Sequence, residues 1–328
     1  MGEVDYEHVE AKARESLREW DITPTELTLI SHTENIVYRV DTGDGTPYAF
    51  RVHRPGYHTF AELNSEPAWT RALNEFGIAA PNPVPTRAGD DYTTIDLPGT
   101  GEGRFVGLVQ WLDGVPLKDH INSAPDGPSR AFHYEQLGAL IAKMHNQAVA
   151  WTPPADFRRH SFNKEGFLGE TPFWGRFWEI PELSDAQRST IIATRDWMDD
   201  QLASFETTTE NFSMIHGDLG PANVLLHEGR LQVIDFDDAG FGWHLYDIAV
   251  ALYQASLREH YDATCDALIE GYRSQRTISE DDLARLPQFN LMRSLALIGW
   301  LHDRPENDFY QYLSQMIDAA CEKADRIL

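Results

Sequence analysis

Apolar and polar positions alternate over short stretches in the first third of the chain. Three stretches, Leu27 to Ile30, Ile36 to Val40 and Tyr48 to His53, have the length and the β-branched or aromatic content of strands. The turn-forming run Asp41-Thr-Gly-Asp-Gly45 separates the second stretch from the third. An antiparallel meander is the simplest arrangement that this pattern predicts.

A second predicted hairpin lies further along the same region. It joins Asp91 to Asp96 with Gly103 to Trp111, and a helical run from Phe60 to Phe76 comes before it. An amphipathic helix over Val4 to Trp20 precedes all the strands. We therefore expect a first lobe, residues 1–112, that holds a five-stranded antiparallel sheet with one long helix.

Beyond residue 112 the pattern becomes helical. Between Phe132 and Val149, apolar residues recur near the helical period, which is typical of a helix that packs one face on a core. The irregular, aromatic-rich segment 151–180 fits either a wall of a substrate pocket or core packing under a long loop. A chain of 328 residues is long enough for two lobes, and we expect the second to cover residues 113–328. Its later helices are predicted at 185–205, 250–257, 262–274, 280–302 and 308–328.

The composition excludes some partners. A formal net charge of −25 at pH 7 argues against a nucleic-acid partner and against an anionic membrane surface. No run approaches the length of a membrane span, and residues 1–20 contain no apolar region of a secretory signal. We expect a soluble, cytoplasmic protein, and the sequence leaves its oligomeric state open.

The candidate chemistry lies between two apolar, strand-like runs, Met214-Ile215 and Val224 to Leu226. Between them, Asp218 and Asn223 stand in a segment rich in Gly, Asp and Pro, which is typical of a loop held by buried strands. A tight turn then returns the chain so that Asp235 ends a neighbouring strand. Two carboxylates and an amide oxygen that converge in this way are hard oxygen ligands of the kind that Mg²⁺ prefers.

Each of these residues also has a plain structural interpretation. Asp218 and Asn223 are common turn or cap residues, and Asp235 is a common residue at a strand end. Their joint occurrence, with the hairpin between them, favours a phosphoryl-transfer site.

The sequence resembles a known family at these positions. The loop reads H-G-D-x-x-x-x-N from His216, and Ile-Asp-Phe-Asp follows at Asp235, which is similar to the catalytic and metal-binding motifs of kinases. Gly replaces the usual Arg, as in aminoglycoside phosphotransferase-like and other small-molecule kinases. Further cues at Ser31 to Tyr38, Arg51 to Gly56, and Leu291 to Ser294 with Trp300-Leu301 resemble the stress-response kinase and type II homoserine kinase subgroup.

The resemblance implies an α+β, bilobal, protein-kinase-like fold and a role for each residue of the loop. Asp218 would orient an acceptor hydroxyl and take its proton, while Asn223 and Asp235 would hold Mg²⁺. His216 would order the loop, and Asp247 would act from the second shell by holding backbone amides near His216 and Gly217.

The resemblance also implies an ATP site in the first lobe. Arg51 stands where the family usually has Lys, Glu66 is its candidate partner, and both would serve the phosphates. Gln110 and Leu112 are candidates for backbone contacts to adenine. The loop 31–35 over the phosphates contains no glycine.

Three functions fit this motif. A small-molecule kinase would act on an amino alcohol, a hydroxy amino acid or an aminoglycoside-like amino sugar. A protein serine/threonine kinase is disfavoured because no Ala-Pro-Glu motif follows Asp235. A pseudokinase-like nucleotide-binding module is supported only by Arg51. Asp237 and Asp238 fit either a cationic group of the acceptor or a solvated surface.

Overall fold

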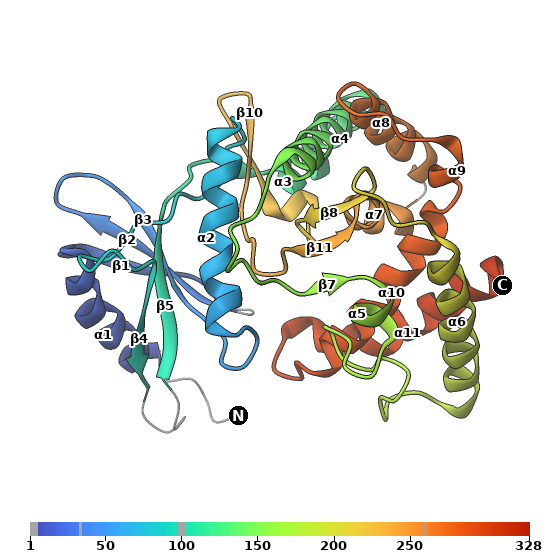
Figure 1. The fold of residues 1–328 in the computed structure, drawn as a ribbon, viewed down its shortest axis with the longest axis horizontal. Helices are drawn as coiled ribbons and strands as arrows, with labels where there is room; N and C mark the ends of the chain where they lie inside the picture. The colour runs from blue at the N-terminus through green and yellow to red at the C-terminus, as the bar shows by residue number, and fades with distance from the viewer. Residues whose placement is uncertain (1–5, 33–34, 98–102, 259) are drawn as a thin grey trace. The chain divides into compact units, whose positions relative to one another are not determined.

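The protein forms two compact units (Figure 1). The computed structural model describes residues 6–32, 35–97, 103–258 and 260–328. The first unit consists of Met1–Asp113 with Thr152–Arg158, and the second consists of Gly114–Trp151 with Arg159–Leu328. The predicted boundary between residues 112 and 113 stays a prediction.

The first unit contains a five-stranded antiparallel sheet in the order β1-β2-β3-β5-β4, as the sequence predicted. Within the described part of this unit, two helices and a 3-10 turn accompany the sheet. Residues Thr33 and Glu34 of the glycine-free loop lie outside the described residues. The element bounds are α1 Tyr6–Ser16, η1 Leu17–Trp20, β1 Pro24–His32, β2 Ile36–Thr42, β3 Tyr48–Val52, α2 Phe60–Glu75, β4 Tyr92–Asp96 and β5 Gly103–Gln110.

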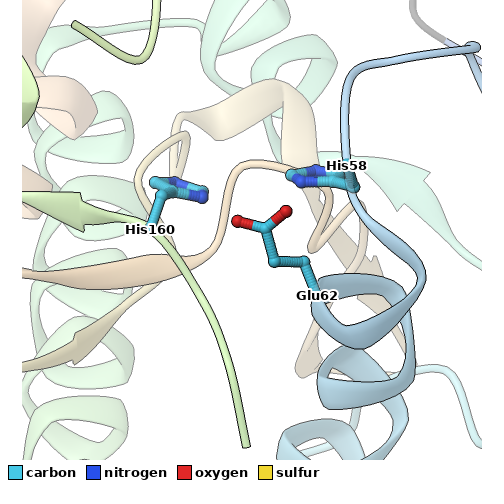
Figure 2. A group of neighbouring side chains, drawn as sticks. All are labelled: His58, Glu62 and His160. Carbon is cyan, nitrogen blue, oxygen red and sulfur yellow. The ribbon is translucent and has the colours of Figure 1, made fainter. Parts of the chain in front are cut away.

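Helix α2 has a well-defined start. Thr59 and Glu62 form a capping box, in which the backbone N–H of Glu62 donates to the Thr59 hydroxyl and the Glu62 carboxylate accepts from the backbone N–H of Thr59. Figure 2 shows Glu62 in the first turn of the helix and His58 in the segment just before it. This start fixes the helix that carries Glu66.

The second unit is mainly helical and holds two small sheets, ordered β10-β9-β6 and β7-β11-β8. An antiparallel sheet in one unit and helices in the other confirm the predicted α+β class. The element bounds are β6 Val115–Pro116, α3 Leu117–Ser123, α4 Gly127–Ala150, β7 Ser161–Phe162, α5 Lys164–Leu168, α6 Asp185–Ser204, β8 Phe212–Ile215, η2 Pro221–Asn223, β9 Val224–His227, β10 Arg230–Val233, β11 Gly240–Trp243, α7 His244–Tyr253, η3 Ala255–Leu257, α8 Tyr261–Arg273, α9 Glu280–Leu283, α10 Leu286–His302, η4 Asp308–Tyr312 and α11 Leu313–Ile327.

The single helix predicted over residues 280–302 is wrong. The structure has two helices there, because α9 ends at Leu283 and α10 begins at Leu286. Pro287 stands in the first turn of α10, where its missing N–H costs nothing; in the interior of a continuous helix it would remove a hydrogen bond and clash with the preceding turn.

The aromatic segment 151–180 packs as core. Phe162 lies against Trp174 and Tyr246, with ring centroids 5.1 and 5.4 Å apart. His160, labelled in Figure 2 just before β7, stacks on Phe173 with centroids 3.5 Å apart. Core packing is thus the interpretation that these contacts favour.

No helix among the described residues combines the length and the apolar character that crossing a membrane requires.

Lys323 of α11 is a partly buried lysine whose hydrogen-bond partners are neutral. Its ammonium donates to Asn290 Oδ1 at 2.8 Å, to Ser294 Oγ at 3.1 Å and to Ser256 Oγ at 3.2 Å. Burial, with the charge of Arg326, lowers the pKa of Lys323 from 10.5 to about 8.

This lowered pKa predicts a pH-dependent stability. Between pH 8 and 10.5 the unfolded chain binds more protons at this site than the folded chain, so the free energy of unfolding rises with pH across that interval. Below pH 8 Lys323 is protonated in both the folded and the unfolded chain, so the folded protein bears the full free-energy cost of burying the ammonium group. We expect Lys323→Met to lose this rise, as measured by urea unfolding at both ends of the interval. The exposed-lysine control Lys143→Met should keep it; an unchanged rise in Lys323→Met would contradict the assignment.

Candidate active site

The β9–β10 hairpin brings two of the predicted residues to one end. Glu228 and Gly229 have φ values of 47° and 77°, as the tight two-residue turn between paired strands requires. At the open end, the N–H of Ile234 donates to the carbonyl of Asn223 at 3.0 Å. Asn223 and Asp235 therefore lie at the same end of the hairpin.

The predicted base and its amide neighbour are in direct contact. The amide nitrogen of Asn223 donates to Asp218 Oδ2 at 2.7 Å and to the Asp218 carbonyl at 2.9 Å. The side-chain oxygen of Asn223 thus points away from these acceptors and is the atom available to a cation.

Asp235 has φ 65°, a left-handed conformation that costs a non-glycine residue about 1–3 kcal/mol and that clusters at functional sites.

His216 ties the loop to the end of the hairpin. Its ring is fully buried, with Nε2 3.0 Å from the carbonyl oxygen of Ile234. Nδ1 accepts from the backbone N–H of Asp218 at 3.3 Å. The contacts made by this histidine are those of a residue that holds the loop in shape.

Asp247, near the start of α7, holds the two peptide groups before Asp218. Its carboxylate is fully buried and accepts from the backbone N–H of His216 at 3.0 Å and from that of Gly217 at 2.8 Å. His145 Nε2 lies 3.3 Å from the same carboxylate. Burial raises the pKa of the Asp247 carboxyl group and lowers that of the His145 ring well below its usual value.

Arg293 of α10 belongs to the stretch Leu291 to Ser294 that carried part of the resemblance, but the sequence assigned it no role in the site. Its buried guanidinium forms an ion pair with Asp218 Oδ1 and lies 5.2 Å from the ring centroid of Trp174. Burial alone would lower its pKa, but the charge of Asp218 and the contact with Tyr246 raise it above its usual value. One signal was present in the sequence: an arginine inside the apolar run 291–301, which a buried helix accepts only with a partner.

Asp237 and Asp238 extend the loop after the hairpin. Asp237 is buried, and its carbonyl accepts from the guanidinium of Arg159. The Asp238 carbonyl lies 3.1 Å from His160 Nε2. Burial excludes the solvated alternative for Asp237.

The first unit holds the predicted nucleotide residues. Arg51 Nη1 donates to Glu66 Oε1 at 2.5 Å, and both side chains are largely buried. The backbone N–H of Gln110 donates to the carbonyl of Asn82 at 2.8 Å, so that donor is already used within the unit. The carbonyl group of Gln110 and the backbone of Leu112, which follows β5, stay predicted contacts to adenine.

Gly217 explains why glycine stands between His216 and Asp218. Its φ is 77°, and a Cβ atom there would lie 2.7 Å from the Asp238 carbonyl oxygen and 2.7 Å from a Phe162 ring carbon. Gly229 has the same φ of 77° but open space around it. Both glycines have a left-handed backbone, but only Gly217 lacks space for a Cβ atom. Alanine substitutions at the two positions therefore distinguish the cost of backbone strain from the cost of a steric clash.

We expect Gly217→Ala to lower the melting temperature clearly more than Gly229→Ala, and to reduce turnover at least about tenfold by displacing the loop. Gly229→Ala should bear only the left-handed backbone cost, on the order of 1–2 kcal/mol. Thermal unfolding and initial rates of both variants test this. Equal effects would show that the space around Gly217 is not restrictive.

A cavity of about 500 Å³ lies beside Asp218 within the second unit. Its polar lining includes Asp218, Asn223 and Arg293, and residues of α7, α10 and α11 contribute much of the rest. A carboxylate held by two partners therefore faces a space that is large enough for an organic molecule.

Comparisons with known proteins place this site in a family. Residues 26–303 match the phosphotransferase enzyme family. A homoserine kinase of Polaromonas naphthalenivorans is 26% identical over 275 residues, 82% of this chain and 78% of that one. The solved structure of a microcompartment-associated aminopropanol kinase has a TM-score of 0.81 at 27% identity and covers 96% of this chain and 95% of the other.

A second solved structure with a similar fold is that of an amicoumacin kinase in complex with AMP-PNP, Ca²⁺ and Ami. It has a TM-score of 0.77 at 20% identity and covers 98% of this chain and 96% of that chain. These likenesses confirm the kinase-like fold that the motif around Asp218 predicted. The chain belongs to the phosphotransferase enzyme family and is a small-molecule kinase.

Proposed function

We propose that the protein transfers the γ-phosphoryl group of ATP, in the presence of Mg²⁺, to a hydroxyl group of a small molecule. The observation that carries this proposal is the set of Asp218, Asn223 and Asp235 around the β9–β10 hairpin. The amicoumacin kinase structure, which contains AMP-PNP and Ca²⁺, supports the choice of nucleotide and of a divalent cation.

The donor atoms fit Mg²⁺. The Asn223 amide nitrogen is taken up by Asp218, which leaves its oxygen for a cation, and Asp235 supplies a carboxylate at the same end of the hairpin. Hard oxygen donors of this kind are the usual protein ligands of Mg²⁺. When bound, the ion would neutralise charge on the phosphates.

Asp218 is the proposed catalytic base. Arg293 engages one of its carboxylate oxygens and Asn223 the other, and each oxygen keeps a second lone pair that can accept from an acceptor hydroxyl. The carboxylate then takes the hydroxyl proton as the oxygen–phosphorus bond forms and ADP leaves with the electrons of the broken bond. His216 and Asp247 act through the backbone of the loop and are positioning residues.

Arg51, with Glu66, is the proposed phosphate contact of the first unit. The ion pair with Glu66 orients the planar guanidinium of Arg51, a group whose fork of N–H donors matches phosphate oxygens. Backbone groups of Gln110 and Leu112 are proposed to receive the adenine ring.

We expect Arg51→Ala to raise the KM for ATP at least about tenfold. The substitution removes the proposed charged contact with the phosphates and leaves the buried Glu66 carboxylate without its ion-pair partner. Arg51→Lys should retain part of the affinity through its point charge. Arg71, which pairs with Asp91 at 3.0 Å, is the control: Arg71→Ala breaks an ion pair in the same unit without a phosphate role. Equal KM values in Arg51→Ala and Arg71→Ala would remove Arg51 from the nucleotide site.

The transfer itself is tested by ADP release. Purified protein is supplied with ATP, Mg²⁺ and a panel of hydroxyl acceptors, namely aminopropanol, homoserine, kanamycin and larger hydroxyl compounds. We expect acceptor-dependent ADP release that stops when EDTA removes the metal, and a product that mass spectrometry shows to carry one added phosphoryl group. ATP binding without turnover on any acceptor would contradict the proposal.

A further inference from the structure

The cavity beside Asp218 is large for a short amino alcohol. Its volume of about 500 Å³ falls in the range of pockets that enclose drug-sized ligands. One water molecule accounts for about 30 Å³ of liquid, so a three- or four-carbon acceptor would fill a small part of this space and leave the remainder wet. The volume favours an acceptor with a substantial body attached to its hydroxyl group.

Much of the cavity lining is apolar. Leu297 and Trp300 come from α10, Val250 from α7, Phe309 from η4 and Met316 from α11. Aromatic and aliphatic side chains of this kind bind apolar groups by removing their surface from water, and these five offer amines no hydrogen bonds. Tyr253 and Gln254 also line the cavity and are neutral polar side chains, so they can accept from an amine but supply no negative charge.

The charges of the lining disfavour a polycation. Among the described residues that line the cavity, Asp218 is the only carboxylate, and it is already paired with Arg293. Arg258 adds a second positive charge to the lining. An aminoglycoside-like acceptor carries several ammonium groups. In this cavity they would lie near two arginines, and the lining would offer them no carboxylate other than the one already paired with Arg293.

We propose that the preferred acceptor is a hydroxyl compound with an aromatic or branched aliphatic body and at most one positive charge. Its hydroxyl lies at Asp218 and its body lies against Leu297 and Trp300. This inference rests on the proposed function, because it names the acceptor class of that same site. Among the acceptor types that the sequence left open, it disfavours the amino sugar, the short amino alcohol and a short hydroxy amino acid such as homoserine.

Binding without nucleotide tests this class. Calorimetry compares four probes: homoserine, N-acetyl-homoserine, N-benzoyl-homoserine and kanamycin. The acetyl and benzoyl forms share the hydroxyl, the carboxylate and the absence of an amine, so they differ only in the apolar body. Burying a ring of phenylalanine size stabilises by roughly 1.5–3 kcal/mol, so the benzoyl form should bind at least about tenfold tighter. Equal dissociation constants for these two forms, or tightest binding of kanamycin, would overturn the inference.

Two variants locate the binding on the apolar wall. Leu297→Trp fills the cavity and should abolish the preference for the benzoyl form. Leu283→Trp makes the same change at a half-buried leucine of α9 that does not line the cavity, and should keep the preference. If thermal unfolding shows that Leu297→Trp does not fold, Trp300→Ala takes its place and should reduce the preference. If a folded Leu297→Trp or Trp300→Ala protein still prefers N-benzoyl-homoserine to the same extent, the apolar body does not bind against these residues.

The two proposals can fail separately. Tight binding of N-benzoyl-homoserine without any ADP release would sustain the ligand class and contradict phosphoryl transfer. ADP release that is most efficient, by kcat/KM, with homoserine or kanamycin would support the transfer and overturn the inferred class.

Discussion

Asp218→Asn is expected to lower kcat by about three orders of magnitude, with little change in the KM for ATP. The amide cannot take the proton of the acceptor hydroxyl, and a positioned general base contributes about 10²–10⁴-fold. The loss belongs to the transition state, so it should be seen in kcat and in kcat/KM alike. Initial rates of ADP formation at saturating ATP and acceptor measure it.

The ion pair with Arg293 requires a stability control for this variant. The Asp218 side chain is 33% exposed and that of Arg293 only 9%, so asparagine leaves a largely buried guanidinium without its counter-charge. A lower melting temperature is therefore expected, and rates must be compared well below it. Asp266→Asn, an exposed aspartate of α8, should match the unmodified protein in both respects. A folded Asp218→Asn protein that keeps kcat within tenfold would remove Asp218 as the base.

Asp247→Asn is expected to lower both stability and turnover. The carboxylate accepts from two backbone amides, whereas an asparagine offers one oxygen and turns its amino group toward the other N–H. Hydrogen bonds to a charged group contribute about 1.5–3 kcal/mol, so a loss of that order is expected for unfolding. Displacement of the loop should reduce kcat about a hundredfold, since misplacement of reacting groups by an ångström has that effect.

Amide hydrogen exchange gives a local measurement of the same change. The N–H groups of His216 and Gly217 should exchange faster in Asp247→Asn, and amides of the distant helix α6 should not. Exchange that rises equally throughout the second unit would indicate general destabilisation rather than release of this loop. Unchanged exchange together with unchanged kcat would show that Asp247 does not position it.

The motif was readable from the sequence because its residues are close along the chain. Asp218, Asn223 and Asp235 all belong to one loop and one hairpin, and the turn at Glu228 and Gly229 sets their register. Local spacing and turn chemistry are the signals that a single sequence carries best. The strands of the first sheet were predictable for the same reason.

Features that depend on distant segments were not readable. Arg293 stands 75 residues after Asp218, and only the packing of α10 brings the two together. The break before α10 had a local signal in Pro287, but it was missed because the apolar period runs through this proline. The cavity is assembled from several helices, so no local pattern describes it.

Helix α10 takes part in two features of the proposed site. It supplies Arg293 to Asp218 and also lines the cavity through Leu297 and Trp300. If the proposals hold, a substitution that reshapes this helix to admit a new acceptor will therefore also shift Arg293, the partner of the proposed base. Lineages that change their acceptor through α10 should lose turnover first and recover it by later compensating changes, whereas changes at Val250 or Met316, on other helices, should broaden acceptor range without that intermediate loss.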